Sequence, residues 1–140
     1  MSKHFFTLIF AAILLVACSA ESVGSGIEIR QAKMGAGAPG EDRAVYLAIR
    51  NHDSETDHLT GASSNAAEVV QLQNGTEVIN VIPVDANREF VFTPDGYHVM
   101  LVGLKQELHE GDKIEVVLQF RDHKDLIINV PVGEAIEHEH

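Results

Sequence analysis

The sequence predicts an all-β domain, a small sandwich or barrel, that follows an N-terminal signal peptide. Short runs of alternating apolar and polar residues fill the chain from Ile27 to Val132, and a period of two is typical of half-buried strands. Turn signals rich in Gly, Pro, Asn and Asp separate these runs, and no long stretch has the period of a helix. Roughly eight or nine strands at this spacing favour a sandwich or barrel.

The first residues predict export. Lys3 precedes an apolar run from Phe5 to Ala17 that a single threonine interrupts. The run is too short for a permanent transmembrane helix, and it lacks the polar stripe of a core helix. It therefore fits the hydrophobic region of a signal peptide that comprises residues 1–17.

Cys18 is expected to carry a lipid anchor. It ends the segment Leu15-Val16-Ala17-Cys18, which resembles a bacterial lipobox, and it is the only cysteine of the chain. Several acyl chains on one residue anchor a protein stably. Ser19 follows in place of an aspartate, which in enterobacteria-like sorting implies the outer membrane, on its periplasmic side. Residues 18–26 then form the lipidated cysteine and a small polar tether.

The charge of the chain excludes some partners. It has 10 Lys and Arg against 21 Asp and Glu, a formal net charge of −11. Removal of residues 1–17 takes away one lysine and no acid. Such a surface repels nucleic acid and anionic lipid headgroups, and it suits cations and basic partners.

The strands are expected in a regular succession, each justified by alternation or by a flanking turn. Asn74-Gly75 predicts a hairpin because both residues tolerate positive φ, and Pro94-Asp95-Gly96 and Glu110-Gly111-Asp112 predict two further turns. The expected strands are Ile27–Arg30, Val45–Arg50, Val69–Gln73, Val78–Val84, Glu89–Phe92, Tyr97–Leu104, Ile114–Phe120 and Leu126–Val132.

These strands form one domain over residues 27–133. Residues 134–140 are an acidic tail with two histidines and no apolar period, so we expect no packed structure there. The segment from Ile114 to Phe120 predicts its own orientation, since Ile114 and Phe120 lie on one face and Glu115 on the other.

His98 and Met100 are the candidate metal ligands. On a strand, residues two apart share a face and lie roughly 6.5 to 7 Å apart at Cα, so the two side chains converge on one region. An imidazole with a thioether is a soft ligand pair that favours Cu(I) over hard cations. For the pair alone, a core methionine beside a hydrogen-bonded surface histidine is the commoner arrangement.

The mature domain resembles the periplasmic copper chaperones of the PCu(A)C type over nearly its whole length. The segments that carry the resemblance are Ala44–Asn51, Asp57–Ser64, Pro83-Val84, Pro94–Lys105 and Leu108–Asp112. The most specific of them contains Tyr97-His98-Val99-Met100-Leu101. The resemblance implies a cupredoxin-like Greek-key β-sandwich or barrel. It also implies a Cu(I)-holding protein that delivers copper to an envelope cuproprotein, such as cytochrome oxidase, or to another copper carrier.

Half of the family's copper motif is missing from this sequence. The family's site pairs the His-x-Met with a further His and Met, and at those places this chain has Gln73 and Val81. Three interpretations follow. Copper binds weakly through His98 and Met100, completed by Met34 or another histidine. Alternatively, the tail supplies His138 and His140. In the third, copper binding is lost and the chain is a lipid-anchored interaction module.

The sequence does not predict an enzyme. It contains no nucleophile motif, phosphate loop or paired-carboxylate signature that stands above its general acidity. Four other histidines lie in or beside expected turns and are interpreted as surface residues: His52, His58, His109 and His123.

Overall fold

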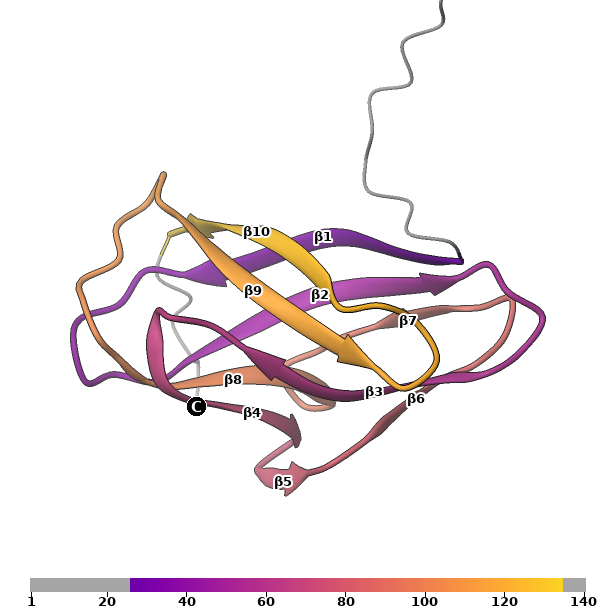
Figure 1. The fold of residues 1–140 in the computed structure, drawn as a ribbon. Helices are drawn as coiled ribbons and strands as arrows, with labels where there is room; N and C mark the ends of the chain where they lie inside the picture. Colours follow the sequence, from indigo (N-terminus) through magenta and orange to yellow (C-terminus); the bar gives the residue numbers. More distant parts are fainter. Residues whose placement is uncertain (1–25, 135–140) are drawn as a thin grey trace, which may run out of the picture.

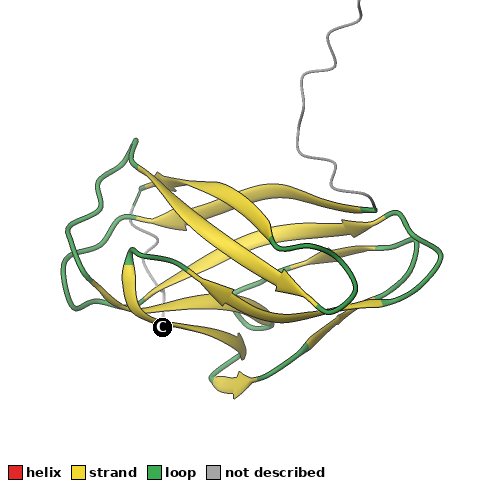
Figure 2. Ribbon diagram, in the orientation of Figure 1, coloured by secondary structure: helices red, strands yellow, loops and turns green. Residues whose placement is uncertain are grey.

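The computed structural model describes residues 26–134, and every regular element in that range is a β-strand (Figure 2). Cys18 and the tail histidines lie outside the described residues. No helix of the described residues is long and apolar enough to cross a membrane. The strands are β1 (Ile27–Gly35), β2 (Arg43–Asn51), β3 (Asp57–Ser63), β4 (Ala67–Asn74), β5 (Glu77–Ile79), β6 (Ile82–Val84), β7 (Glu89–Val91), β8 (Tyr97–Leu104), β9 (Lys113–Phe120) and β10 (Leu126–Gly133).

The strands follow one hydrogen-bonded path that nearly closes into a barrel. The order is β5-β4-β8-β2-β1-β10-β9-β3-β6, and β7 pairs with β2 off this path. The pairs between the described strands are antiparallel except β1 with β10, which pair in parallel at Met34↔Val132 and Gly35↔Gly133. In Figure 1, β9 and β3 cross in front of β2 and β8, so the two halves of the path face each other. The predicted all-β sandwich or barrel is therefore confirmed.

The core lies between these halves and follows the alternation of the strands. On β9, Ile114, Val116, Leu118 and Phe120 are buried, while Glu115 and Gln119 are exposed, as predicted. On β8, Val99 and Leu101 are fully buried. Burial of apolar surface of this kind is the main stabilising contribution to a domain of this size.

Two details of the strands differ from the sequence-based expectation. The run Val78–Val84 is two short strands, because the chain bends at Asn80 between β5 and β6. The segment Asp57–Ser63 is a full strand, β3, that pairs with both β6 and β9.

Gly103 adopts a positive φ of 69°, which interrupts the alternation of β8. Beyond it, Leu104 is buried although it shares strand parity with the partly exposed Val102.

Candidate metal centre

Strand β8 presents His98 and Met100 on the outer face of the sheet. Because Val99 and Leu101 point into the core, the alternating positions 98 and 100 point away from it. β8 lies between β4 and β2, and Met100 pairs with Gln71 on one side and with Ala44 on the other. Met100 is partly buried in this position rather than part of the core. The structure thus places the His-x-Met doublet on the outer face of β8.

His98 is almost completely covered by its neighbours, with an exposure of 3%. Its ring lies 6.0 Å from the ring of Tyr46, centroid to centroid, and Gln73 stands directly opposite on β4. The Nδ1 atom is 3.0 Å from the carbonyl oxygen of Gly96. A carbonyl only accepts hydrogen bonds, so Nδ1 carries a proton and donates it.

This tautomer leaves Nε2 of a neutral His98 with a lone pair. Metal-binding imidazoles commonly donate their other ring N–H to a backbone carbonyl, which fixes the ring and the free nitrogen. Nε2 of His98 is therefore the atom suited to a metal. Gln73 lies against it, with Oε1 at 3.2 Å.

The Gln73 amide acts as a cap on this nitrogen. Its Nε2 donates to Oε1 of Gln71 at 3.2 Å, so the two glutamines hold each other beside the doublet. With the amide oxygen toward His98, the ring donates from both nitrogens and is an imidazolium. With the amide turned, its NH₂ group donates to the lone pair of a neutral ring. In both orientations Gln73 must move before Nε2 binds a metal.

The donor set at this face fits a soft monovalent ion better than a hard one. His98 and Met100 supply one imidazole and one thioether, the ligand types that suit Cu(I). Gln71 and Gln73 add only amide groups, and an amide oxygen suits harder ions such as Mg²⁺ or Ca²⁺. The described residues therefore offer two soft ligands at this face.

The other residues considered for the site lie elsewhere. Met34 is 1% exposed and stands opposite Val45, so it belongs to the core, on the inner side of the sheet. It cannot complete a shell on the outer face. Val81 lies in the bend between β5 and β6 and is 38% exposed, and its isopropyl group offers no ligand atom.

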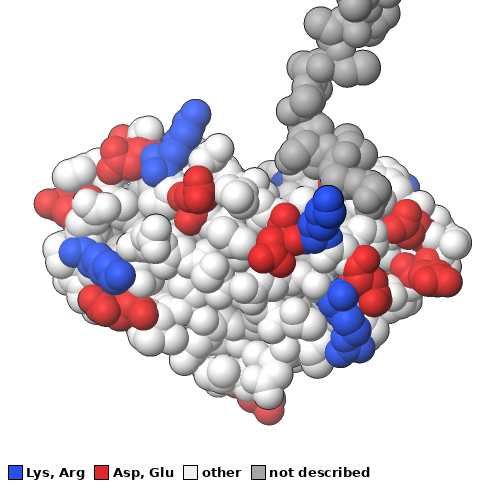
Figure 3. Space-filling view, viewed as in Figure 1, with Lys and Arg blue, Asp and Glu red and all other residues white. Residues whose placement is uncertain are grey.

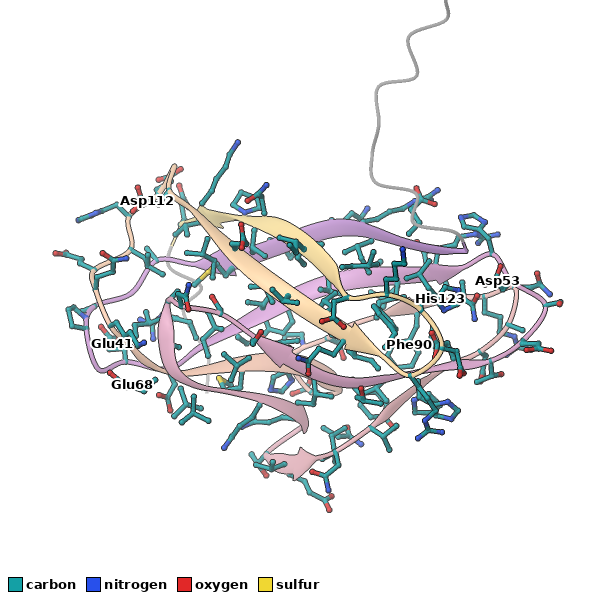
Figure 4. All side chains as sticks on the ribbon, in the orientation of Figure 1. Glu41, Asp53, Glu68, Phe90, Asp112 and His123 are labelled. Atoms are coloured by element: carbon teal, nitrogen blue, oxygen red, sulfur yellow. The ribbon has the colours of Figure 1, made fainter. Side chains whose placement is uncertain are left out.

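A second histidine cluster lies near the end of the barrel where β1 begins. His123, in the loop between β9 and β10, contacts Asp57 Oδ2 through Nδ1 at 2.5 Å and Asp53 Oδ2 through Nε2 at 2.6 Å. Figure 4 shows Asp53 and His123 together at this end. Carboxylates accept from both ring nitrogens, so His123 is held as an imidazolium.

The pKa values of this cluster shift as the contacts require. The hydrogen bond to Asp57 raises the pKa of His123 against the opposing effect of burial, and Asp53 adds to the rise. Burial alone raises the pKa of Asp57, but the bonds from His123 and from the backbone N–H groups of His58 and Asp122 outweigh it, so its pKa is lowered.

The interpretation of four histidines as surface residues holds for His52 and His109, which are exposed, but not for His58 and His123, which are partly buried. The side chain of His123 is only 16% exposed and that of His109 is 68% exposed. His58 lies within β3 and is partly buried, with its Nδ1 atom lacking a hydrogen-bond partner in the described part of the chain. No local sequence signal indicated these contacts, because Asp57 and His123 are 66 residues apart.

Among the described residues, the carboxylate that a metal at the His123 end would need is already engaged. One ligand atom each from Asp57, His58 and Asp122 lies within 4.8 Å of the others. The carboxylate of Asp57, however, already accepts three hydrogen bonds, from the backbone N–H groups of His58 and Asp122 and from His123. The His123 imidazolium supplies the positive charge that this buried carboxylate needs.

The barrel has the fold of PCuAC copper chaperone domains. The copper-bound PCuAC domain from PmoF2 superposes with a TM-score of 0.74, covering 82% of this chain and 98% of that domain at 23% identity. The solution structure of CuI-DR1885 from Deinococcus radiodurans superposes with a TM-score of 0.66, covering 85% and 87% at 23% identity.

The chain belongs to the LpqE-like family. The model of that family, described as "Putative lipoprotein LpqE-like", matches residues 27–132. A putative lipoprotein of Leifsonia xyli subsp. xyli is 32% identical over 118 residues, which span 78% of this chain and 70% of the relative. The sequence predicted a resemblance to the PCu(A)C copper chaperones and a lipoprotein member of that type. The fold and the family match together confirm this resemblance.

Proposed function

We propose that this protein is a copper-binding, chaperone-like lipoprotein of the cell envelope. It holds Cu(I) through Nε2 of His98 and the sulfur of Met100 and passes the ion to an envelope cuproprotein or another copper carrier. The observation that supports this most is the placement of both soft ligands on the outer face of β8, with Val99 and Leu101 filling the core behind them.

The geometry suits transfer of an ion rather than its retention. A site with few ligands leaves room for a partner's ligand to join before the donor's ligands leave. Met100 is partly exposed, and Gln73 contacts the His98 ring through one hydrogen bond of 3.2 Å. When the ring is neutral, such a bond contributes only about 0.5 to 1.5 kcal/mol net, so a soft metal can displace the Gln73 amide.

Cu(I) titration of the mature chain against a competing chelator tests the proposal. Met100→Ala should weaken Cu(I) binding, and deletion of residues 134–140 should have a smaller effect. The two ligand types respond differently to acid: a thioether has no proton to gain, whereas tail histidines protonate near a pKa of about 6.5. Affinity that survives in Met100→Ala but is lost on deleting the tail would contradict the proposal.

A second candidate function rests on Gln73. An amide stands on the nitrogen that a metal needs, and Val81 has no ligand atom, as expected of an interaction module that kept the fold without copper. Gln73→His separates the two cases. If the outer face binds copper, this variant adds a third soft ligand opposite His98 and tightens Cu(I) binding at least about tenfold. Absence of Cu(I) binding in the wild type, with binding gained only in Gln73→His, would favour the interaction module.

Location is the remaining part of the proposal. Residues 1–17 act as the signal peptide, and Cys18 carries the lipid on the periplasmic side of the outer membrane. Cys18→Ser should release or misprocess the protein, which membrane fractionation and mass spectrometry of the mature N-terminus would show. Recovery of the wild type as an unlipidated soluble species would contradict anchoring.

A further inference from the structure

Exposed apolar side chains gather on the side of the barrel that carries the His-x-Met doublet. Five large apolar residues are exposed in the described part of the chain, and three of them lie on or directly after β4 and β5. These are Val69 at 49%, Val78 at 55% and Val81 at 38%. The other two, Val91 and Ile127, lie on β7 and β10.

The strand register places this apolar group next to the doublet. Val69 pairs with Val102, and Gln71 pairs with Met100. Val78 on β5 stands opposite Gln73, which in turn stands opposite His98. We call the outer-facing side chains of these three rows the β4–β8 face: Val69, Val102, Gln71, Met100, Val78, Gln73 and His98.

The β4–β8 face carries no acidic residue, lysine or arginine, although such residues make up 22% of the chain. Depletion of charge with exposed aliphatic groups is the composition of the centre of a protein interface, and exposed apolar patches on soluble proteins commonly mark interaction sites. Figure 3 shows the side of the barrel formed by β9 and β3, where acidic and basic groups are both scattered over the surface; the outer face of β8 points away from the viewer.

Three exposed acidic residues lie beside this face. Glu77 begins β5, beside Val78, and is exposed. Asp42 accepts a hydrogen bond from the N–H of Gly103, the residue after Val102. Asp95, in the turn before β8, is exposed and lies two residues before Tyr97, which stands opposite Asn74 on β4.

We propose that the β4–β8 face docks a protein whose own apolar patch is ringed by lysine or arginine side chains. The inference rests on the proposed function, because it makes the copper-bearing face the surface that the receiving protein contacts. A second copy of this chain fits poorly, since two acidic rims would then face each other in a protein of net charge −11. Opposite charge on the partner also speeds encounter.

The test uses the metal-free mature chain with reduced cytochrome c as probe, a basic protein whose lysines surround an exposed apolar haem edge. Amide signals of the ¹⁵N-labelled chain are followed during titration at low salt. Changes should concentrate on β4, β5 and the first half of β8, and should fade at 0.2 M salt. Changes centred on the acidic loops around Asp53 and Asp122, or spread evenly over the barrel, would overturn the proposal.

Matched variants sharpen the test. Val69→Ser with Val78→Ser should raise the Kd for the probe at least about fivefold, because it removes apolar area from the centre of the contact. Val91→Ser with Ile127→Ser removes side chains of similar exposure from other strands and should change Kd less than about twofold. Equal effects of the two pairs, or a chain that elutes as a dimer at micromolar concentration, would contradict the docking surface.

The two proposals fail separately. Because the probe titration contains no copper, a docking result stands even if the wild type binds no Cu(I). Conversely, Cu(I) binding with no localised probe contact would overturn the docking surface and leave the copper proposal intact.

Discussion

His98 and His123 are two covered imidazoles of one small barrel, and their surroundings differ in charge. His98 lies between a backbone carbonyl, the Gln73 amide and the Tyr46 ring, all neutral. His123 lies between the carboxylates of Asp53 and Asp57. Neutral neighbours leave His98 able to present a lone pair at Nε2, whereas two carboxylates keep a proton on each nitrogen of His123.

The difference shows that burial alone does not make a histidine a metal ligand. A ligand must be deprotonated at the binding nitrogen, and only the outer-face histidine meets this condition without losing a strong ionic contact. His123 instead joins the β2–β3 loop to the β9–β10 loop. One histidine is suited to bind an ion, and the other stabilises the end of the barrel.

The largest expected effect comes from Asp57. Asp57→Ala leaves the His123 imidazolium without its buried counter-ion and removes the acceptor of two backbone N–H groups, so it should cost about 3 to 5 kcal/mol in the free energy of unfolding. Asp53→Ala, whose carboxylate is 45% exposed, is the control and should cost about 1 kcal/mol or less. Urea unfolding measures both; equal losses would show that the buried carboxylate has no special role.

The next largest effect compares a core residue of β8, Val99, with an outer-face residue of the same strand, Met100. Val99→Ala removes a fully buried side chain and should destabilise the metal-free protein by about 2 kcal/mol or more. Met100→Ala truncates a partly exposed side chain and should cost clearly less, about 1 kcal/mol. Thermal unfolding without copper compares them. If the methionine variant is the more damaged and Cu(I) affinity is unchanged, Met100 is a core residue.

The smallest effect is the pH dependence due to His123. Its folded-state pKa is raised. Its contribution to the free energy of unfolding is therefore fully present below the unfolded-state pKa of about 6.5, and is lost as pH rises through the higher folded-state pKa. The stability difference between wild type and His123→Gln should therefore be largest near pH 6, on the order of 1 kcal/mol, and shrink in alkali. Chemical unfolding at several pH values measures it; a difference that grows with pH would contradict the imidazolium.

At low pH, protonation of Asp57 breaks the same ion pair with His123. Because its folded-state pKa is lowered, its contribution is present above the unfolded-state value and is lost as pH falls through the lower one. The ion pair is therefore complete only at pH values between the lowered folded-state pKa of Asp57 and the raised folded-state pKa of His123.

The sequence predicted the features that depend on local alternation. The orientation expected for β9 is the one observed, and β8 follows the same alternation, with Val99 and Leu101 inside and the doublet outside. Alternation is a local pattern set by the pleat of a strand, so residues two apart carry enough information.

Contacts between distant segments were not predictable in this way. His123 and Asp57 each looked like polar residues at the edge of a turn, and only the pairing of β3 with β9 brings their loops together. The near-complete burial of His98 likewise depends on Tyr46 and Gln73, which belong to β2 and β4. The bend at Asn80 also interrupts an apolar run that by itself reads as one strand.

The most direct measurement is the imidazole ¹⁵N spectrum of the mature chain during Cu(I) addition. The account predicts that Nε2 of His98 shifts as it becomes metal-bound, that Nδ1 keeps its proton toward Gly96, that the Met100 methyl signal moves with it, and that His123 does not change. Unchanged His98 and Met100 signals, with shifts confined to His138 and His140, would contradict it.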